Sequence, residues 1–325
     1  MKSDDSSLSK VSKWWDQSPE ELEQRSLIAW MEHEHIKRHI NRRTTGDESL
    51  DWFRYILQQY FPTPVNRALS LGCGDGGLER YALHAGAVAI FDAYDASSGA
   101  IETARKTAEI EGLLPRINYA VADLNQLQVP INRYEAVFAS MSIHHVQALE
   151  AVFEGVRNGL KPSGYFILNE YIGPTRFQLP PIQIKLINDL LNILPQDLRR
   201  IIREGKVTTE IKSGHQIHPL SWFDDNDPSE AVRSSDILPL LQRFFRIIEF
   251  KPYGGTLLQF ILENIAGNFD EKQAEHRAWL DVLAYLENTL EDAGLIGSDF
   301  ALIVASQKTL GSKDKSPAFV TGSLG

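Results

Sequence analysis

Apolar residues between Arg67 and Gly173 gather in short, dense runs that alternate with longer segments of mixed polarity. Short apolar runs bounded by glycine or polar residues predict buried strands, whereas the longer segments repeat their apolar residues at helical spacing. Strands separated by single helices are typical of βαβ units and a parallel sheet. The predicted strands span 68–71, 89–95, 117–123, 134–140 and 165–172.

The alternation stops after Gly173 and Pro174, and residues 175–222 have the pattern of an insertion that contains one apolar helix. The alternation returns further along the chain, so the sheet continues after the insertion. The elements predicted there are a helix at 236–245, a strand at 246–253, helices at 256–268 and 274–293, and a last strand at 299–306.

The region before the first strand is predicted to be helical. Thr45 with Glu48 fits a capping box, which would open a helix carrying Phe53 and Leu57 on its apolar face. Pro62 would end that helix because proline cannot continue it.

Composition limits the class of protein. A hydrophobic fraction of 43% and a mean hydropathy of -0.24 describe a globular chain. The 43 acidic and 33 basic residues give a net charge of -10, which disfavours broad binding to nucleic acid. Cys73 is the single cysteine, so no intrachain disulfide can form. With no signal-peptide pattern and no apolar run near ~20 residues, we expect a cytoplasmic protein without stable membrane insertion, and a homodimer stays open.

A glycine-rich turn is the first candidate for chemistry. Gly72, Gly74 and Gly77 match G-x-G-x-x-G between a predicted strand and helix, a pattern that lets the backbone approach a ligand but is weak alone. Asp95 ends the second predicted strand, where a carboxylate can bind both ribose hydroxyls of an adenosine. Asp123 ends the third predicted strand, and its side chain can reach an adenine amino group. A nicotinamide enzyme would explain Asp95 but does not require Asp123.

Four segments in order, LSLGCGDGG, FDAYD, YAVADL and GLKPSGYFILNEY, resemble the successive motifs of class I S-adenosylmethionine-dependent methyltransferases across residues 67–173. SIHHV at 142–146 resembles the segment after the fourth strand in small-molecule members of that family. The resemblance implies an α/β fold with a doubly wound, Rossmann-like sheet of seven strands, the last one antiparallel. It also implies S-adenosyl-L-methionine as cofactor and S-adenosyl-L-homocysteine as product.

The resemblance also implies the residues that hold the cofactor. Gly72, Cys73 and Gly74 would line its methionine and ribose part, Asp95 would hold the ribose with Ala96 beside the adenine, Asp123 and Leu124 would bind the adenine edge, and Ser140 and Met141 would lie beside the sulfonium. One departure from the family matters. Its usual acid two residues before the first glycine is Ser70 here, so a backbone carbonyl or water could replace the contact to the methionine amino group.

Methyl transfer is an in-line displacement in which the protein aligns the acceptor and can remove its proton. Candidate bases lie at the carboxyl ends of the fourth and fifth strands, and they are His145 first, then His144 and Glu170. Either histidine could instead cap the next helix, and Glu170 could form a salt bridge. We see no residues with metal-ligand spacing and expect no metal.

Further candidates are less specific. Arg176, Arg233 and Tyr253 are predicted substrate contacts, although a helix-capping loop would also explain the polar segment 218–234. The predicted division of the chain is a disordered lead at 1–10, an N-terminal helical cap at 11–64, a cofactor-binding core at 65–174, a lid or substrate insertion at 175–235, the second half of the core at 236–308 and a flexible tail at 309–325.

These observations predict an enzyme that methylates an oxygen or nitrogen of a small molecule, such as a secondary metabolite or a glycan-like compound. The small-molecule part rests on analogy at the level of the fold. Three alternatives stay open: a protein or peptide methyltransferase, a protein that binds S-adenosylmethionine without catalysis, and an NAD-dependent oxidoreductase.

Overall fold

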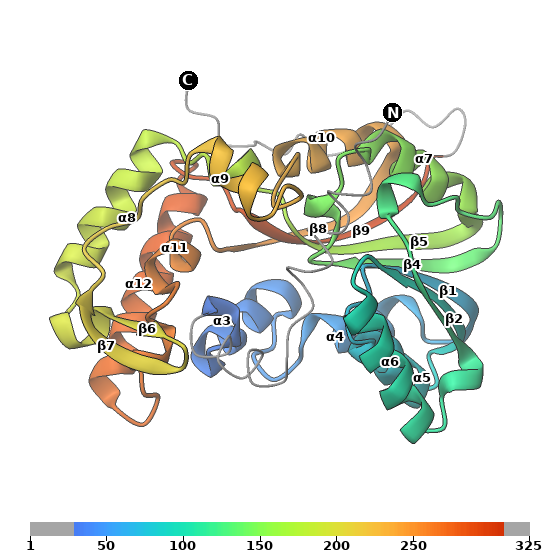
Figure 1. The fold of residues 1–325 in the computed structure, drawn as a ribbon, viewed down its shortest axis with the longest axis horizontal. Coiled ribbons are helices and arrows are strands. Elements are labelled where there is room, and N and C mark those ends of the chain that lie inside the picture. Colours follow the sequence, from blue (N-terminus) through green and yellow to red (C-terminus); the bar gives the residue numbers. More distant parts are fainter. Residues whose placement is uncertain (1–28, 309–325) are drawn as a thin grey trace.

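The computed structural model describes residues 29–308 (Figure 1). The predicted lead at 1–10, the first part of the predicted N-terminal cap and the predicted tail at 309–325 lie outside these residues. Within them, no helix is both long enough and apolar enough to cross a membrane.

A seven-stranded sheet forms the centre of the described chain, with the order β3-β2-β1-β4-β5-β9-β8. The first five strands pair in parallel, and β9 runs antiparallel to both β5 and β8. This confirms the predicted sheet with its antiparallel last strand. The strands are β1 (Val65–Leu71), β2 (Val88–Asp95), β3 (Ile117–Val121), β4 (Tyr134–Ser140), β5 (Leu160–Tyr171), β8 (Phe245–Gly254) and β9 (Phe300–Gln307).

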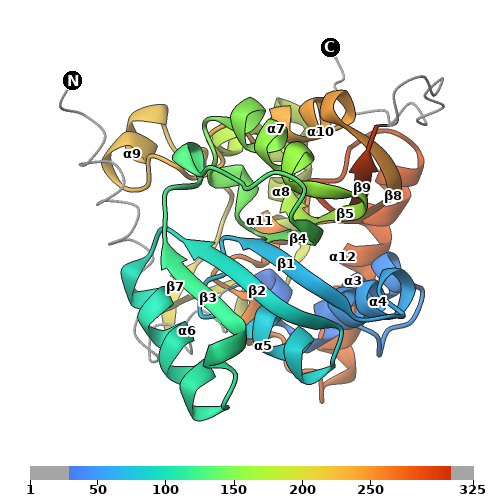
Figure 2. The same cartoon turned by 90° about the vertical axis from the view of Figure 1, so that its right-hand side faces the viewer.

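Helices cover both faces of the sheet, which explains why its central strands are apolar almost throughout (Figure 2). Successive side chains of a strand point to opposite faces. In β1, Ala68 packs with one helical layer and Leu69 with the other. The first layer contains α4 (Trp52–Tyr60), α5 (Gly77–His84) and α6 (Ser98–Ile110), and the second contains α7 (Leu149–Gly159) and α10 (Ser234–Phe244).

A third apolar cluster lies beside the sheet, at the left of Figure 1, and we call it the cap. Ile36, Ile187 and Ile261 are fully buried in it and come from three different helices. The cap contains α3 (Glu34–Thr45), α8 (Pro181–Ile193), α11 (Leu258–Leu262) and α12 (Ala274–Asp292). The hairpin of β6 (Arg200–Arg203) and β7 (Lys206–Ile211) and the short α9 (Leu220–Asp225) complete the insertion.

The apolar helix predicted in the insertion is α8, whereas the hairpin was not predicted. The prediction also grouped the helices between the last two strands with the core. In the structure α11 and α12 pack with α8 and α3, because these helices share one apolar cluster beside the sheet.

The capping box predicted at Thr45 was wrong. Helix α3 ends at Thr45, and Gly46 closes it with a left-handed backbone at φ 85°. The Thr45 hydroxyl donates to the Asn41 carbonyl, 2.8 Å away, within the same helix. Helix α4 begins later, where the Asp51 carboxylate accepts hydrogen bonds from the backbone N–H groups of Phe53 and Arg54. Aspartate is an equally good N-cap residue, and here it provides the cap.

Short 3₁₀ helices connect several of these elements. They are η1 (Trp30–Glu32), η2 (Leu114–Arg116), η3 (Leu124–Gln126), η4 (Ile143–His145), η5 (Thr175–Phe177), η6 (Gln196–Arg199) and η7 (Ala266–Asn268). Two of them, η3 and η4, follow the carboxyl ends of β3 and β4. Strand β1 lies between β2 and β4, so the strand order reverses there, and doubly wound sheets bind ligands at the carboxyl edge of this reversal.

Candidate active site

The glycine turn connects β1 to α5 at that carboxyl edge. The backbone N–H groups of Gly72 and Cys73 both donate to the Tyr94 carbonyl, at 2.8 and 3.0 Å, which ties the turn to the end of β2. Gly72 has φ +72°, and an added Cβ would lie only 2.3 Å from the Ser142 Cβ. Glycine is therefore required at this position both by the backbone conformation and by the close approach of the segment after β4.

Asp95 joins the turn to the loop after β2. One carboxylate oxygen accepts a hydrogen bond from the Gly74 N–H at 2.8 Å, and the other accepts one from the Ser97 N–H at 2.8 Å. Asp123 lies after the neighbouring strand, where its carboxylate accepts from the backbone and side chain of Asn125, each at 2.9 Å. Both acids therefore lie at the predicted edge. Asp123 also caps η3, so the structure supports a local role beside the predicted contact to adenine.

The end of β4 carries an uncommon backbone. Met141 has φ 52° although it is not glycine, and its N–H donates to the Asn169 carbonyl of β5 at 2.9 Å. Left-handed residues other than glycine cost energy and often mark functional sites. The Ser142 hydroxyl donates to the Leu71 carbonyl at 2.7 Å, so the segment after β4 is fastened to the glycine turn. Ser140 and Met141 are half-buried beside it.

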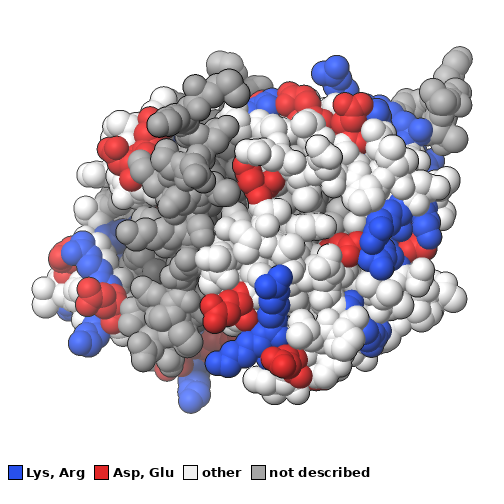
Figure 3. Space-filling view, turned by 45° about the vertical axis from the view of Figure 1, so that its right-hand side comes forward, with Lys and Arg blue, Asp and Glu red and all other residues white. Residues whose placement is uncertain are grey.

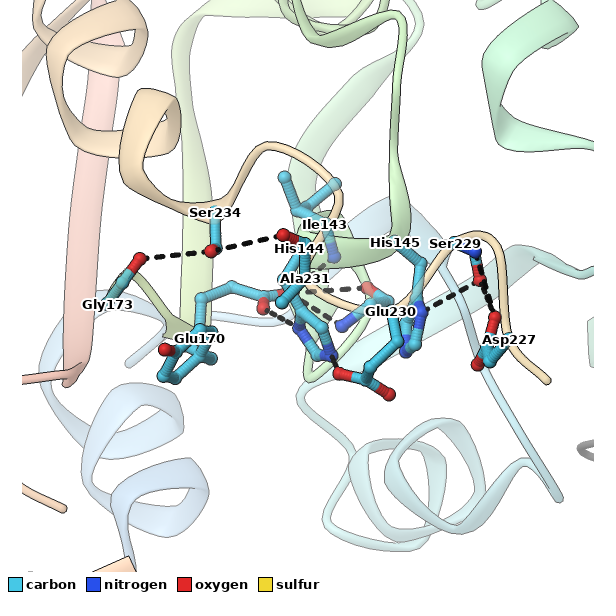
Figure 4. A network of polar contacts seen from close by, with 12 residues as sticks. Ile143, His144, His145, Glu170, Gly173, Asp227, Ser229, Glu230, Ala231 and Ser234 are labelled. Atoms are coloured by element: carbon cyan, nitrogen blue, oxygen red, sulfur yellow. Dashed lines mark hydrogen bonds and ion pairs between the residues drawn. The ribbon is translucent and has the colours of Figure 1, made fainter. Parts of the chain in front are cut away.

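Glu170 organises the segment that follows. Its side chain is 0% exposed, and one carboxylate oxygen accepts hydrogen bonds from the N–H groups of Ser142 and Ile143 at 2.7 and 2.6 Å. The other oxygen lies 2.8 Å from Nδ1 of His144, which is 5% exposed. Glu170 and His144, two of the predicted catalytic residues, are thus brought into direct contact. Figure 4 shows the His144 ring between the carboxylates of Glu170 and Glu230.

His145 faces the loop between α9 and α10. Its Nδ1 lies 3.0 Å from the Ser229 hydroxyl, which donates to the Asp227 carboxylate at 2.6 Å (Figure 4). From the same loop, the Glu230 carboxylate lies 3.8 Å from Nε2 of His144. The partners of the two histidines, Asp227, Ser229 and Glu230, were not predicted from the sequence. Only the acidic, turn-rich character of this segment pointed to it.

Three nearby carboxylates raise the pKa of His144. Burial lowers its pKa, but Glu170 first, and then Glu230 and Asp227, raise it by more, so the net pKa lies above 6.5. A buried imidazole with a raised pKa indicates that positive charge is favoured at this point of the structure.

Comparisons with known proteins bear on the same part of the chain. Residues 68–164 match the family model of a methyltransferase domain. The sterol 24-C-methyltransferase erg6 of Aspergillus fumigatus is 30% identical over 121 residues, which cover 36% of this chain and 31% of that protein. The fatty-acid O-methyltransferase of Mycolicibacterium smegmatis is 27% identical over 155 residues, covering 46% and 54%. The chain thus spans 31% and 54% of the length of these curated relatives.

A solved structure extends the likeness in fold. A geranyl diphosphate methyltransferase, in complex with GPP and sinefungin, aligns with a TM-score of 0.54 at 12% identity, over 93% of this chain and 100% of that chain. Residues 68–164 thus match a methyltransferase domain, and the seven-stranded sheet has the class I methyltransferase fold. Strands β2, β3 and β4, the glycine turn and the Asp95–Asp123 edge lie within the matched residues, whereas β8, β9 and most of the cap lie outside them.

The methyltransferase domain has a buried acid that the sequence analysis missed. Glu79 is 0% exposed in the first turn of α5, and burial raises its pKa to about 7, an effect that the nearby Ser70 hydroxyl only partly offsets. Neither carboxyl oxygen has a hydrogen bond of ordinary geometry among the described residues. Glu79 therefore places a carboxyl group close to Ser70, where the family usually has its acid. Burial of Cys73 and, second, the charge interaction with Glu79 raise the pKa of the Cys73 thiol, which disfavours a nucleophilic thiolate there.

The three predicted substrate residues all have partners within the protein. The Arg176 guanidinium donates to the carbonyls of Pro228 and Glu230, at 2.6 and 2.8 Å. Arg233 forms salt bridges to Glu150 and Asp236, at 2.7 and 2.8 Å. Tyr253 is 1% exposed, and its hydroxyl donates to the Asn169 side chain at 2.8 Å. Arg176 therefore holds the loop that carries Glu230 and Ser229, and contact with a substrate stays a prediction for all three.

Proposed function

We propose that this chain is an S-adenosylmethionine-dependent methyltransferase that acts on a small molecule. The observation that carries the proposal is the carboxyl edge of the sheet. There the Asp95 carboxylate accepts a hydrogen bond from the Gly74 N–H. The Ser142 hydroxyl, in the segment after β4, donates to the Leu71 carbonyl just before the same turn. This edge has the carboxylate for a ribose, the close backbone for a methionine chain and the histidines for an acceptor.

We further propose that the acceptor atom is an oxygen or a nitrogen. Hydroxyl and ammonium groups must lose a proton to attack a methyl group, and His145 lies at the edge as a candidate to assist this loss. The His145 ring is oriented by Ser229 and Asp227, as a catalytic base is usually oriented by a third group. The curated relatives include a C-methyltransferase and an O-methyltransferase, so the choice rests on these residues.

The surface supports a small molecule over a nucleic acid. On the face that Figure 3 shows, lysine and arginine side chains are interspersed with acidic ones and separated by uncharged surface. Phosphate backbones need a continuous basic surface, which this face of the described residues lacks. A protein or peptide acceptor and a non-catalytic role remain alternatives that the experiment below addresses.

Calorimetry with S-adenosylhomocysteine and with NAD tests the cofactor. Binding of the first and not the second is expected, and the reverse result would replace the proposal with an oxidoreductase. Transfer of tritiated methyl groups to a panel of phenols, sugars, amines, fatty acids, sterols and peptides then tests catalysis. Tight binding of S-adenosylhomocysteine without transfer to any acceptor would favour the non-catalytic alternative, and transfer to peptides alone would favour the peptide methyltransferase.

A further inference from the structure

Three side chains converge between η4 and the loop before α10. His144, His145 and Glu230 each offer one donor atom, and these atoms lie within 4.8 Å of one another. A metal ion with bonds of ~2.0–2.2 Å to nitrogen and oxygen can bind two donor atoms that lie up to ~4 Å apart. The 3.8 Å between Nε2 of His144 and the Glu230 carboxylate lies within this limit. Donor atoms that lie up to 4.8 Å apart would have to come closer together to bind the same ion.

Hydrogen bonds prepare both imidazoles to donate an electron pair. The Glu170 carboxylate accepts from Nδ1 of His144, so the proton of the neutral ring lies on Nδ1 and the electron pair on Nε2. At His145, the Ser229 hydroxyl already donates to Asp227 and can only accept from Nδ1. The proton again lies on Nδ1, and the electron pair on Nε2. Carboxylates that fix the far nitrogen of a histidine in this way are typical of metal ligands, directly or through one more group.

The charge around the two rings also favours a cation. The carboxylates of Glu170, Asp227 and Glu230 come together around the two imidazoles. Arg176, which holds the same loop, donates to its backbone carbonyls. One oxygen of the Asp227 carboxylate is buried without a hydrogen bond among the described residues.

We propose that His144, His145 and Glu230 form a binding site for a divalent transition metal ion, with zinc as the first candidate. Two histidines and one glutamate are the ligand set of several catalytic zinc sites, which keep a further position open for water or substrate. Magnesium and calcium are disfavoured because they prefer oxygen ligands. No metal was predicted from the sequence, because Glu230 lies far along the chain from the histidines and shows no ligand spacing.

The site deepens the proposed function and rests on it for its catalytic role. A bound metal would take the acceptor oxygen or nitrogen at its open position and lower the pKa of that group. His144 and His145 would then act as ligands, and proton loss from the acceptor would depend on the metal instead of on His145 as a base. Metal binding itself can be measured without any acceptor.

The test uses the full chain purified without chelator, and then stripped with a chelator and titrated with Zn²⁺ or Co²⁺. We expect stoichiometric zinc in the purified protein and a visible absorption band on adding Co²⁺ to the stripped protein. His145→Ala and Glu230→Gln should each weaken Zn²⁺ binding at least ~10-fold, and Asp227→Asn should weaken it by about 10–100-fold because it orients His145. Circular dichroism would establish that each variant is folded.

A matched control is His84→Ala, since His84 forms an exposed pair with Glu111 at 2.8 Å elsewhere in the chain. It should bind Zn²⁺ as the unmodified protein does. Absence of zinc together with absence of the Co²⁺ band overturns the proposal, and so does equal binding by all variants. Calorimetry with S-adenosylhomocysteine separates the two proposals. If the stripped protein binds it but no metal binds, only the metal site fails; if metal binds without it, the proposed function fails.

Discussion

The Glu170 carboxylate contacts the His144 ring at 2.8 Å while it also accepts two backbone N–H groups from the residues just before that ring. A single buried side chain from β5 thus determines both the path of the chain after β4 and the protonated nitrogen of His144. Because all of its partners are donors, the carboxylate form fits this position well.

We expect Glu170→Gln to lower the free energy of unfolding by about 1–3 kcal/mol. Glutamine can still accept from the N–H groups of Ser142 and Ile143, but its amide group would meet the Nδ1–H of His144 with a second donor. Urea denaturation monitored by circular dichroism measures the change. Glu154→Gln is the control, since Glu154 pairs with Arg157 on the surface and should change stability by less than ~1 kcal/mol. Equal effects of the two substitutions would contradict the role given to Glu170.

The sheet could be predicted from the sequence because each strand carries its own signal. Strands such as β4 and β5 are dense apolar runs between helices, and this local pattern determines both their position and their parallel pairing. The glycine turn and Asp95 were found for the same reason, because each lies at the end of such a run. Their partners, the Tyr94 carbonyl and the Gly74 N–H, are neighbours across the sheet.

Only part of the cluster formed by His144, His145, Glu170 and Glu230 could be predicted from the sequence. His144, His145 and Glu170 were found because they follow β4 or lie in β5. Glu230 reaches them from a loop that packs over η4, where the Val232 N–H donates to the His144 carbonyl at 3.1 Å. No local pattern encodes such a contact between distant segments. The same limit explains the cap, in which α11 and α12 join α8 through shared apolar surface.

Gly72→Ala should destabilise the protein more than Gly86→Ala. Both glycines have left-handed backbones, at φ +72° and +69°, so each alanine pays about 1–2 kcal/mol for that conformation. At Gly86 nothing lies within 4 Å of an added Cβ, whereas at Gly72 the Cβ of Ser142 is 2.3 Å away. The clash should cost a further ~1–3 kcal/mol and should weaken cofactor binding. Thermal unfolding of the two variants gives the comparison, and equal melting temperatures would show that the turn and η4 are not tightly packed.

Asp95→Asn should weaken the binding of S-adenosylhomocysteine by at least ~1–3 kcal/mol, because an amide cannot accept from both ribose hydroxyls. Asparagine keeps one oxygen for the Gly74 or Ser97 N–H, so the turn should stay folded. Asp75→Asn is the control in the same turn, since Asp75 is exposed and its carboxylate accepts from the Gly77 N–H, which an amide oxygen can also do. Calorimetry on the three proteins decides the matter. Unchanged affinity in Asp95→Asn would mean that the ribose binds elsewhere.

The buried Glu79 should make the protein less stable as the pH rises. Its pKa is about 7 in the folded protein and near 4.5 when unfolded, so the folded state holds the proton more tightly. The stability this gives is complete below pH 4.5 and is lost as the pH rises through 7, by about 3 kcal/mol. Asp299, with a pKa raised to about 7 by burial, acts in the same direction.

Glu79→Gln isolates the contribution of this carboxyl group, because glutamine has the same shape and does not titrate. Urea denaturation at pH 5 and at pH 8 should show that the variant loses less stability between the two values than the unmodified protein, by about 2.5 kcal/mol. Glu102→Gln is the control, since Glu102 is an exposed residue of α6, and it should keep the pH dependence of the unmodified protein. If Glu79→Gln also kept that dependence, Glu79 would have to be charged in the folded protein and balanced by a cation close to Ser70.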